Sequence, residues 1–68
     1  MFKVYDVVRL KKDLPSKNLV IGTRGAVLMV YPHLLQTADY EVEFVDADGY
    51  TLAVITISED YLEQNMEM

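Results

Sequence analysis

Glu41 and Glu43 form the acidic pair whose spacing most resembles that of an active site. They are two residues apart in a segment typical of a β-strand, which places them on one face. By strand rise they would be about 6–7 Å apart. Two carboxylates at such a separation can act as a catalytic pair in glycoside hydrolysis. No cleft is indicated around them, and carboxylates on the solvated side of a strand are common. We therefore expect no catalytic pair here.

The segment Asp46-Ala-Asp-Gly49 resembles part of a calcium-binding loop. A complete loop needs further oxygen ligands and a bidentate glutamate at its twelfth position. Counted from Asp46, the twelfth residue is Ile57, which cannot bind a cation. We therefore expect a turn and no metal site.

Other catalytic groups are scarce in this chain. It has no cysteine and one histidine, His33, which follows a proline in an expected loop. The serines Ser16 and Ser58 are in turn-like or helix-capping contexts, without a base placed beside them by the sequence. Because a nucleophile needs a base within hydrogen-bond reach, we expect no enzyme, no catalytic residue and no cofactor.

These groups are positioned by a β-hairpin that the sequence predicts over residues 39–57. Two runs rich in β-branched and aromatic residues flank the Asp46–Gly49 cluster, which suits a three-residue turn with glycine in the left-handed position. This turn would place Phe44 opposite Leu52, and Val42 opposite Val54. The predicted inner face then consists of Tyr40, Val42, Phe44, Leu52 and Val54. The predicted second face consists of Glu41, Glu43, Val45, Ala53, Ile55 and Ile57.

The remaining segments favour a small all-β fold. Strands are expected at residues 5–11 and 22–31, and a 3₁₀ turn capped by Ser58 should precede a short last strand at 62–63. The apolar connection 11–21 is expected to fold over a sheet face and cover Ile55 and Ile57. A flat sheet would expose its edges, whereas closure removes them. We therefore predict one domain, residues 1–68, forming a five-stranded SH3-like barrel with a frayed tail at 64–68.

Charge is distributed unevenly along the chain. The formal net charge is -5, yet all six basic residues are in the first 24 positions. That part carries +4, and the rest carries −9 without a lysine or arginine. The two halves could pair their charges across strands, or leave an acidic face for a basic partner. The absence of cysteine and of an apolar run near 18 residues, together with the lack of signal-peptide features, favours a cytoplasmic protein and excludes a membrane helix.

The motifs VRLKKDLP, GTRGAV and YEVEFVDADGYTLAVITI together resemble a family of short, mostly bacterial proteins known as domain of unknown function 4926. The resemblance spans about Asp6 to Leu62 and implies a small SH3-like barrel, but no activity. The stretch from Gly22 to Val27 is also similar to the glycine-containing turn of KOW modules, which bind RNA and ribonucleoproteins.

We expect a non-catalytic module that binds a protein partner. The candidate surface comprises Ala53, Ile55, Ile57, Glu41 and Glu43, and it depends on whether the connection 11–21 covers the Ile55 side or leaves it exposed. The alternative is a KOW-like nucleic-acid-binding module that uses the basic N-terminal third. The acidic remainder disfavours nucleic acid as a partner. Self-association through an edge strand or through the Ile55 side is left open.

Overall fold

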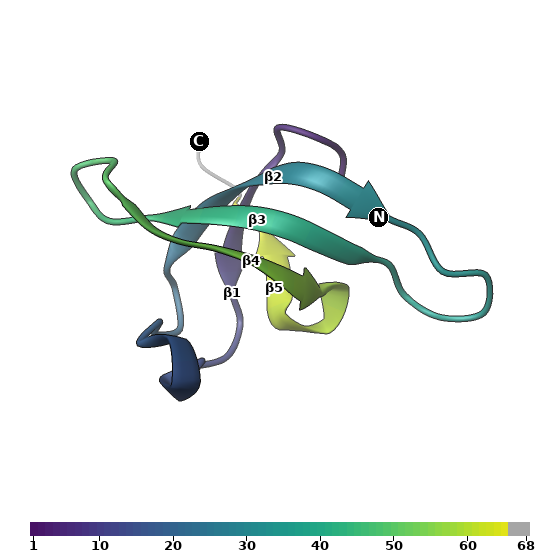
Figure 1. Ribbon diagram of the computed structural model, residues 1–68, viewed down its shortest axis with the longest axis horizontal. Coiled ribbons are helices and arrows are strands. Elements are labelled where there is room, and N and C mark those ends of the chain that lie inside the picture. The colour runs from purple at the N-terminus through teal and green to yellow at the C-terminus, as the bar shows by residue number, and fades with distance from the viewer. Residues whose placement is uncertain (66–68) are drawn as a thin grey trace.

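The computed structural model describes residues 1–65, which form one antiparallel sheet of five strands with two 3₁₀ turns (Figure 1). Its strand order is β4-β3-β2-β1-β5, so the first strand of the chain lies beside the last. The predicted all-β class, the five strands and the 3₁₀ turn before the last strand are confirmed. In chain order the elements are β1 (Val7–Leu10), η1 (Pro15–Lys17), β2 (Arg24–Tyr31), β3 (Asp39–Val45), β4 (Thr51–Ser58), η2 (Glu59–Tyr61) and β5 (Leu62–Gln64).

The sheet does not close as a barrel, so this part of the prediction is wrong. Its two edges are β4 and β5, and each pairs with one neighbour in the described chain. The reason is visible in the last elements. η2 turns the chain away from β4 directly after Ser58, and the three residues of β5 then pair with β1 at the opposite edge (Figure 1).

The core lies on one face of the sheet, where the two-residue period of the strands gathers apolar side chains. β3 alternates strictly, with Tyr40, Val42 and Phe44 fully buried and the intervening residues partly exposed. This half of the predicted inner face is confirmed. The other strands and the first connection complete the core with Val8, Leu10, Leu19, Val27, Ile57 and Leu62.

The turn between β3 and β4 has the predicted form. The Asp46 amide donates to the Tyr50 carbonyl at 2.9 Å, and Gly49 has a φ of 88°. The Asp46 carboxylate accepts hydrogen bonds from the amides of Asp48 at 2.9 Å and Tyr50 at 3.0 Å. The turn therefore starts the hairpin in the predicted register.

A bulge then shifts that register by one residue. Val45 pairs with Thr51, but the next pair joins Phe44 to Ala53, which leaves Leu52 as the extra residue of β4. Beyond the bulge, Ala53, Ile55 and Ile57 pair with Phe44, Val42 and Tyr40. The predicted inner positions of Leu52 and Val54 are therefore wrong, because these side chains are 52% and 50% exposed.

The connection between β1 and β2 covers the core only in part. Leu19 is buried and Leu14 is packed against the same cluster as Ile55 and Ile57. Ile57 is buried and Ile55 is half-buried, so they do not form an exposed apolar patch. In contrast, Val20 and Ile21 are 64% and 61% exposed. The predicted cover therefore comes from the middle of the connection, and its end faces solvent.

The chain remains ordered beyond the point where fraying was predicted. Gln64 belongs to β5, and the Asn65 amide donates to the Val7 carbonyl at 3.0 Å. Both residues of the expected tail that the structure describes are therefore bonded to β1. Residues 66–68 lie outside the described part of the chain.

Tyr40 joins three distant parts of the chain through its hydroxyl group. The side chain is fully buried, its Oη donates to Glu59 Oε1 at 2.6 Å, and it accepts from the Phe2 amide at 2.9 Å. The Phe2 and Tyr40 rings also pack at 5.4 Å between centroids. Desolvation and the hydrogen bond to Glu59 raise the pKa of Tyr40 to about 12. The neutral phenol is thus the form that the fold stabilises.

We expect the stability of the domain to fall as the pH rises from 10 to 12. Tyr40 ionises near pH 10 in the unfolded chain but only near 12 in the fold. Its contribution is therefore complete below pH 10 and is lost through this interval, by up to about 1.4 kcal/mol per pH unit. Urea unfolding of the wild type and of Tyr40→Phe, at pH 8 and pH 11, measures the effect.

Tyr40→Phe should be less stable at pH 8 by roughly 1–3 kcal/mol, since Glu59 and the Phe2 amide lose a partner. It should also lose much less stability between pH 8 and pH 11 than the wild type does. Tyr50→Phe is the matched control, because Tyr50 is 72% exposed and Tyr40 stays intact. Equal alkaline losses in wild type and Tyr40→Phe would contradict the assignment.

Candidate interaction surface

The five residues of the predicted surface lie on two faces of the sheet. Ala53, Ile55 and Ile57 point to the core side, opposite residues of β3 that are fully buried. Glu41 and Glu43 alternate with those buried residues and lie on the outer face. The one-residue shift at Leu52 turns Ala53, Ile55 and Ile57 to the core side, so the two groups do not form one continuous surface.

The chemical candidates of the sequence are dispersed in the same way. The Glu41 carboxylate accepts a hydrogen bond from the Tyr31 hydroxyl at 3.2 Å, and Glu43 accepts one from Thr51 Oγ1. Desolvation, with smaller effects from Glu41, raises the pKa of Tyr31.

His33 Nε2 is 3.1 Å from Asp39 Oδ2 at the surface. Among residues 1–65, no three acidic, histidine or cysteine side chains are grouped to hold a metal, and no helix is long and apolar enough to cross a membrane.

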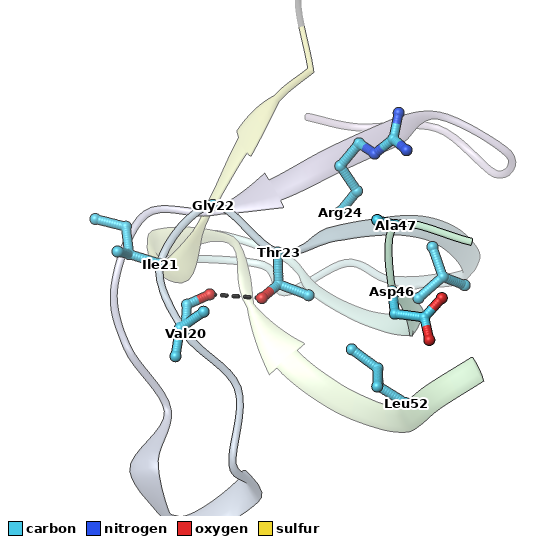
Figure 2. Close-up of a pocket in the computed structure, with 9 residues that line it drawn as sticks. Val20, Ile21, Gly22, Thr23, Arg24, Asp46, Ala47 and Leu52 are labelled. Atoms are coloured by element: carbon cyan, nitrogen blue, oxygen red, sulfur yellow. Dashed lines mark hydrogen bonds between the residues drawn. The ribbon is translucent and has the colours of Figure 1, made fainter. Parts of the chain in front are cut away.

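A groove opens between the segment 20–24 and the turn that joins β3 to β4 (Figure 2). It has a volume of about 380 Å³. Its most exposed apolar side chains are Val20 and Ile21 on one side and Leu52 on the other, where Asp46 also lies, and Arg24 adds a positive charge to the lining (Figure 2). Sequence reasoning placed all three apolar residues in or over the core and therefore missed this site.

Local hydrogen bonds hold the apolar wall of the groove in place. The Asp13 carboxylate accepts from the Ile21 amide at 2.7 Å. Thr23 Oγ1 donates to the Val20 carbonyl at 2.7 Å (Figure 2). Gly22 has a φ of 90°, which favours glycine at this turn. Val20 and Ile21 are therefore displayed on a fixed turn. The Gly-Thr turn directly after two apolar residues is the signal that could have indicated this.

The second component of the surface is the outer edge of β4. This strand is eight residues long, TLAVITIS, and contains no charged residue and no proline. Among the described strands, β3 is its only pairing partner. Val54 and Thr56 are exposed in the middle of the edge, and Leu52 connects the edge to the groove. Such a long, uncharged edge is able to pair with another strand.

Acidic residues are concentrated in the segments directly before and after β4, with Arg24 near the first segment and Lys12 near the second. Asp46 and Asp48 precede β4 in the turn, and Glu59 and Asp60 follow it in η2. Lys12 Nζ lies 4.8 Å above the ring of Tyr61, and Arg9 pairs with Glu63 at 3.3 Å. The exposed carboxylates of Asp48 and Asp60 therefore lie at the two ends of β4, whereas the Glu59 carboxylate is bonded to Tyr40.

Comparison with known proteins gives one match. A family model described as Domain of unknown function (DUF4926) matches residues 4–64, which include all five strands. No curated protein and no solved structure matches the chain.

Proposed function

Because the chain belongs to this family of unknown function, we propose a role from its surface: it is a non-catalytic module that binds a protein partner. The observation that carries the proposal is the continuity of the groove with the edge of β4. Together they display Val20, Ile21, Leu52 and Val54, each at least half exposed, on ordered backbone. Exposed apolar patches with a polar rim are typical of protein-binding sites. A cytoplasmic location, favoured by the absence of cysteine, is part of this proposal.

We expect capture by the tagged protein to depend on the groove. A Val20→Glu/Ile21→Glu variant should stay folded, because both side chains face solvent, and should lose the partner that the wild type retains. The matched control is Leu34→Glu/Leu35→Glu, which makes the same change at two side chains that are 95% and 94% exposed in the loop between β2 and β3. Affinity capture from native lysate, quantified by mass spectrometry, compares the three forms. Equal recovery with all three would contradict a role for the groove.

Nucleic-acid binding through Arg9, Lys11, Lys12, Lys17 and Arg24 is the alternative. Lys11, Lys12 and Lys17 are exposed around η1, which supports it, whereas the contacts of Arg9 with Glu63 and of Lys12 with Tyr61 favour a structural role for two of the five. Binding through phosphates weakens steeply with salt. Titration of labelled RNA and DNA at 50 and 200 mM salt separates the two functions, and we expect no saturable binding at either.

A further inference from the structure

We infer that β4 accepts an extended segment of the partner as a sixth strand, and that this segment is apolar or β-branched in its centre with lysine or arginine at both ends. The inference rests on the proposed function and specifies the partner's chemistry. Backbone hydrogen bonds along a free edge supply affinity in this mode of recognition, and side chains on alternate positions supply specificity.

The backbone of β4 provides the pairing groups. The Glu59 amide donates to the Ala38 carbonyl at 3.0 Å, which fixes the phase of the ladder between β3 and β4. Since antiparallel residues alternate between facing the partner strand and facing away, the amides of Ser58, Thr56 and Val54 point away from β3. These positions line the outer edge, and the side chains of Thr56 and Val54 are exposed.

The two edges of the sheet differ in how well they are protected against pairing with another strand. Proteins block free edges with charged side chains, proline, bulges or short strands. β5 is three residues long and contains Glu63, whereas β4 is eight residues long, has no charge or proline, and is bulged only at Leu52 near its start. β4 is thus the edge suited to accept a strand.

The charges at the two ends of β4 favour a cationic segment over a second copy of this chain. In a symmetric pair of β4 strands, the two copies would run antiparallel. Asp48 of one copy would then lie near Asp60 of the other, so exposed like charges would meet at both ends. The net charge of -5 adds to this repulsion. A segment with cationic ends instead places opposite charges at both ends of β4.

The probes are three synthetic peptides, each acetylated and amidated. KKTVTVTVKK has the proposed pattern, EETVTVTVEE reverses its charge, and KKTVPVTVKK keeps the charge but has a proline that is incompatible with a central strand position. We expect saturable binding of the first peptide. The second and third should bind at least about tenfold more weakly, because like charges meet or a strand cannot form.

Amide hydrogen exchange of the full chain locates the bound peptide. With KKTVTVTVKK, exchange at Val54 and Thr56 should slow by at least about tenfold, while amides of β5 should be unchanged. The variant Asp48→Lys/Asp60→Lys should reverse the preference and bind EETVTVTVEE more tightly. Such a gain cannot result from unfolding, and an unchanged urea midpoint provides a second check.

Three results would overturn the inference: equal binding of the lysine and glutamate peptides, protection confined to residues outside β4, or a peptide-free dimer in sedimentation with protected β4 amides. These results leave the capture experiment intact. If the groove variant still loses a protein partner while no peptide pairs with β4, the proposed function stands and only the strand mode fails.

Discussion

Replacing Phe44 with alanine should unfold the domain at room temperature. Phe44 is fully buried near the end of β3, a strand that is paired on both sides, with β4 and with β2. Truncating a buried phenylalanine costs roughly 3–5 kcal/mol. A single core in a chain of this length supplies about the same net stability. Far-UV circular dichroism and urea unfolding should show loss of the sheet or a transition already under way without denaturant.

Leu52→Ala is the informative control for Phe44→Ala. The hairpin pattern assigned both residues to one inner face, but Leu52 is the bulged residue and is 52% exposed. Its truncation should cost less than about 1 kcal/mol, since little buried surface is lost. A folded, stable Phe44→Ala protein, or equal losses in the two variants, would contradict the core described above.

Gly25→Ala should produce the second large loss of stability, although it adds a single methyl group. A Cβ atom at this position would lie 2.7 Å from Val42 Cγ1, 2.9 Å from the Glu43 carbonyl oxygen and 2.9 Å from Phe44 Cδ1. The carbonyl belongs to the paired backbone of β3 and cannot move without separating β2 from β3. Overpacking of this kind costs about 1–3 kcal/mol or more.

The urea midpoint of Gly25→Ala measures this loss, and the single variant Ala26→Ser is the matched control. Ala26 is the next residue of β2 and alternates to the outer face, so an added atom there should be tolerated within about 0.5 kcal/mol. A midpoint for Gly25→Ala equal to that of the wild type would mean that the two strands approach less closely than described.

The sequence was informative where one physical rule acted alone. Alternation with polar partners identified Tyr40, Val42 and Phe44, because Glu41 and Glu43 between them cannot be buried without cost. Turn chemistry identified Asp46 and Gly49. Ser58 was also correctly predicted as a cap, since its side chain accepts from the Asp60 amide.

Prediction failed where neighbouring positions were equally apolar. The run from Leu52 to Ile57 has apolar residues at both odd and even positions, so no alternation reveals a one-residue shift. The register is decided by the bulge, which depends on how β4 packs on β3. The second register shift, between Val27 and Met29 in β2, occurs in a similarly apolar stretch. The shift at Leu52 is why the residues of the predicted surface lie on two faces of the sheet.

Closure of the sheet could not be predicted from edge avoidance. A free edge is tolerated in two ways here: β4 keeps a long edge, and β5 is protected by being short. Whether two edges meet depends on strand lengths and on the direction of the connecting turn at Glu59 to Tyr61. The length of β5 was predicted closely, whereas the path of the chain into it has no sequence signal.

The pairing of β1 with β5 affects how fast the domain folds. Arg9 and Glu63, which face each other across β1 and β5, are 54 residues apart in the sequence. Such a contact encloses nearly the whole chain in one loop, and the entropy of closing it must be lost before the pairing is gained. Local hairpins can form early, but the transition state has to bring remote strands together. This small domain is therefore expected to fold in milliseconds to seconds, as sheets with distant pairings do, despite its length.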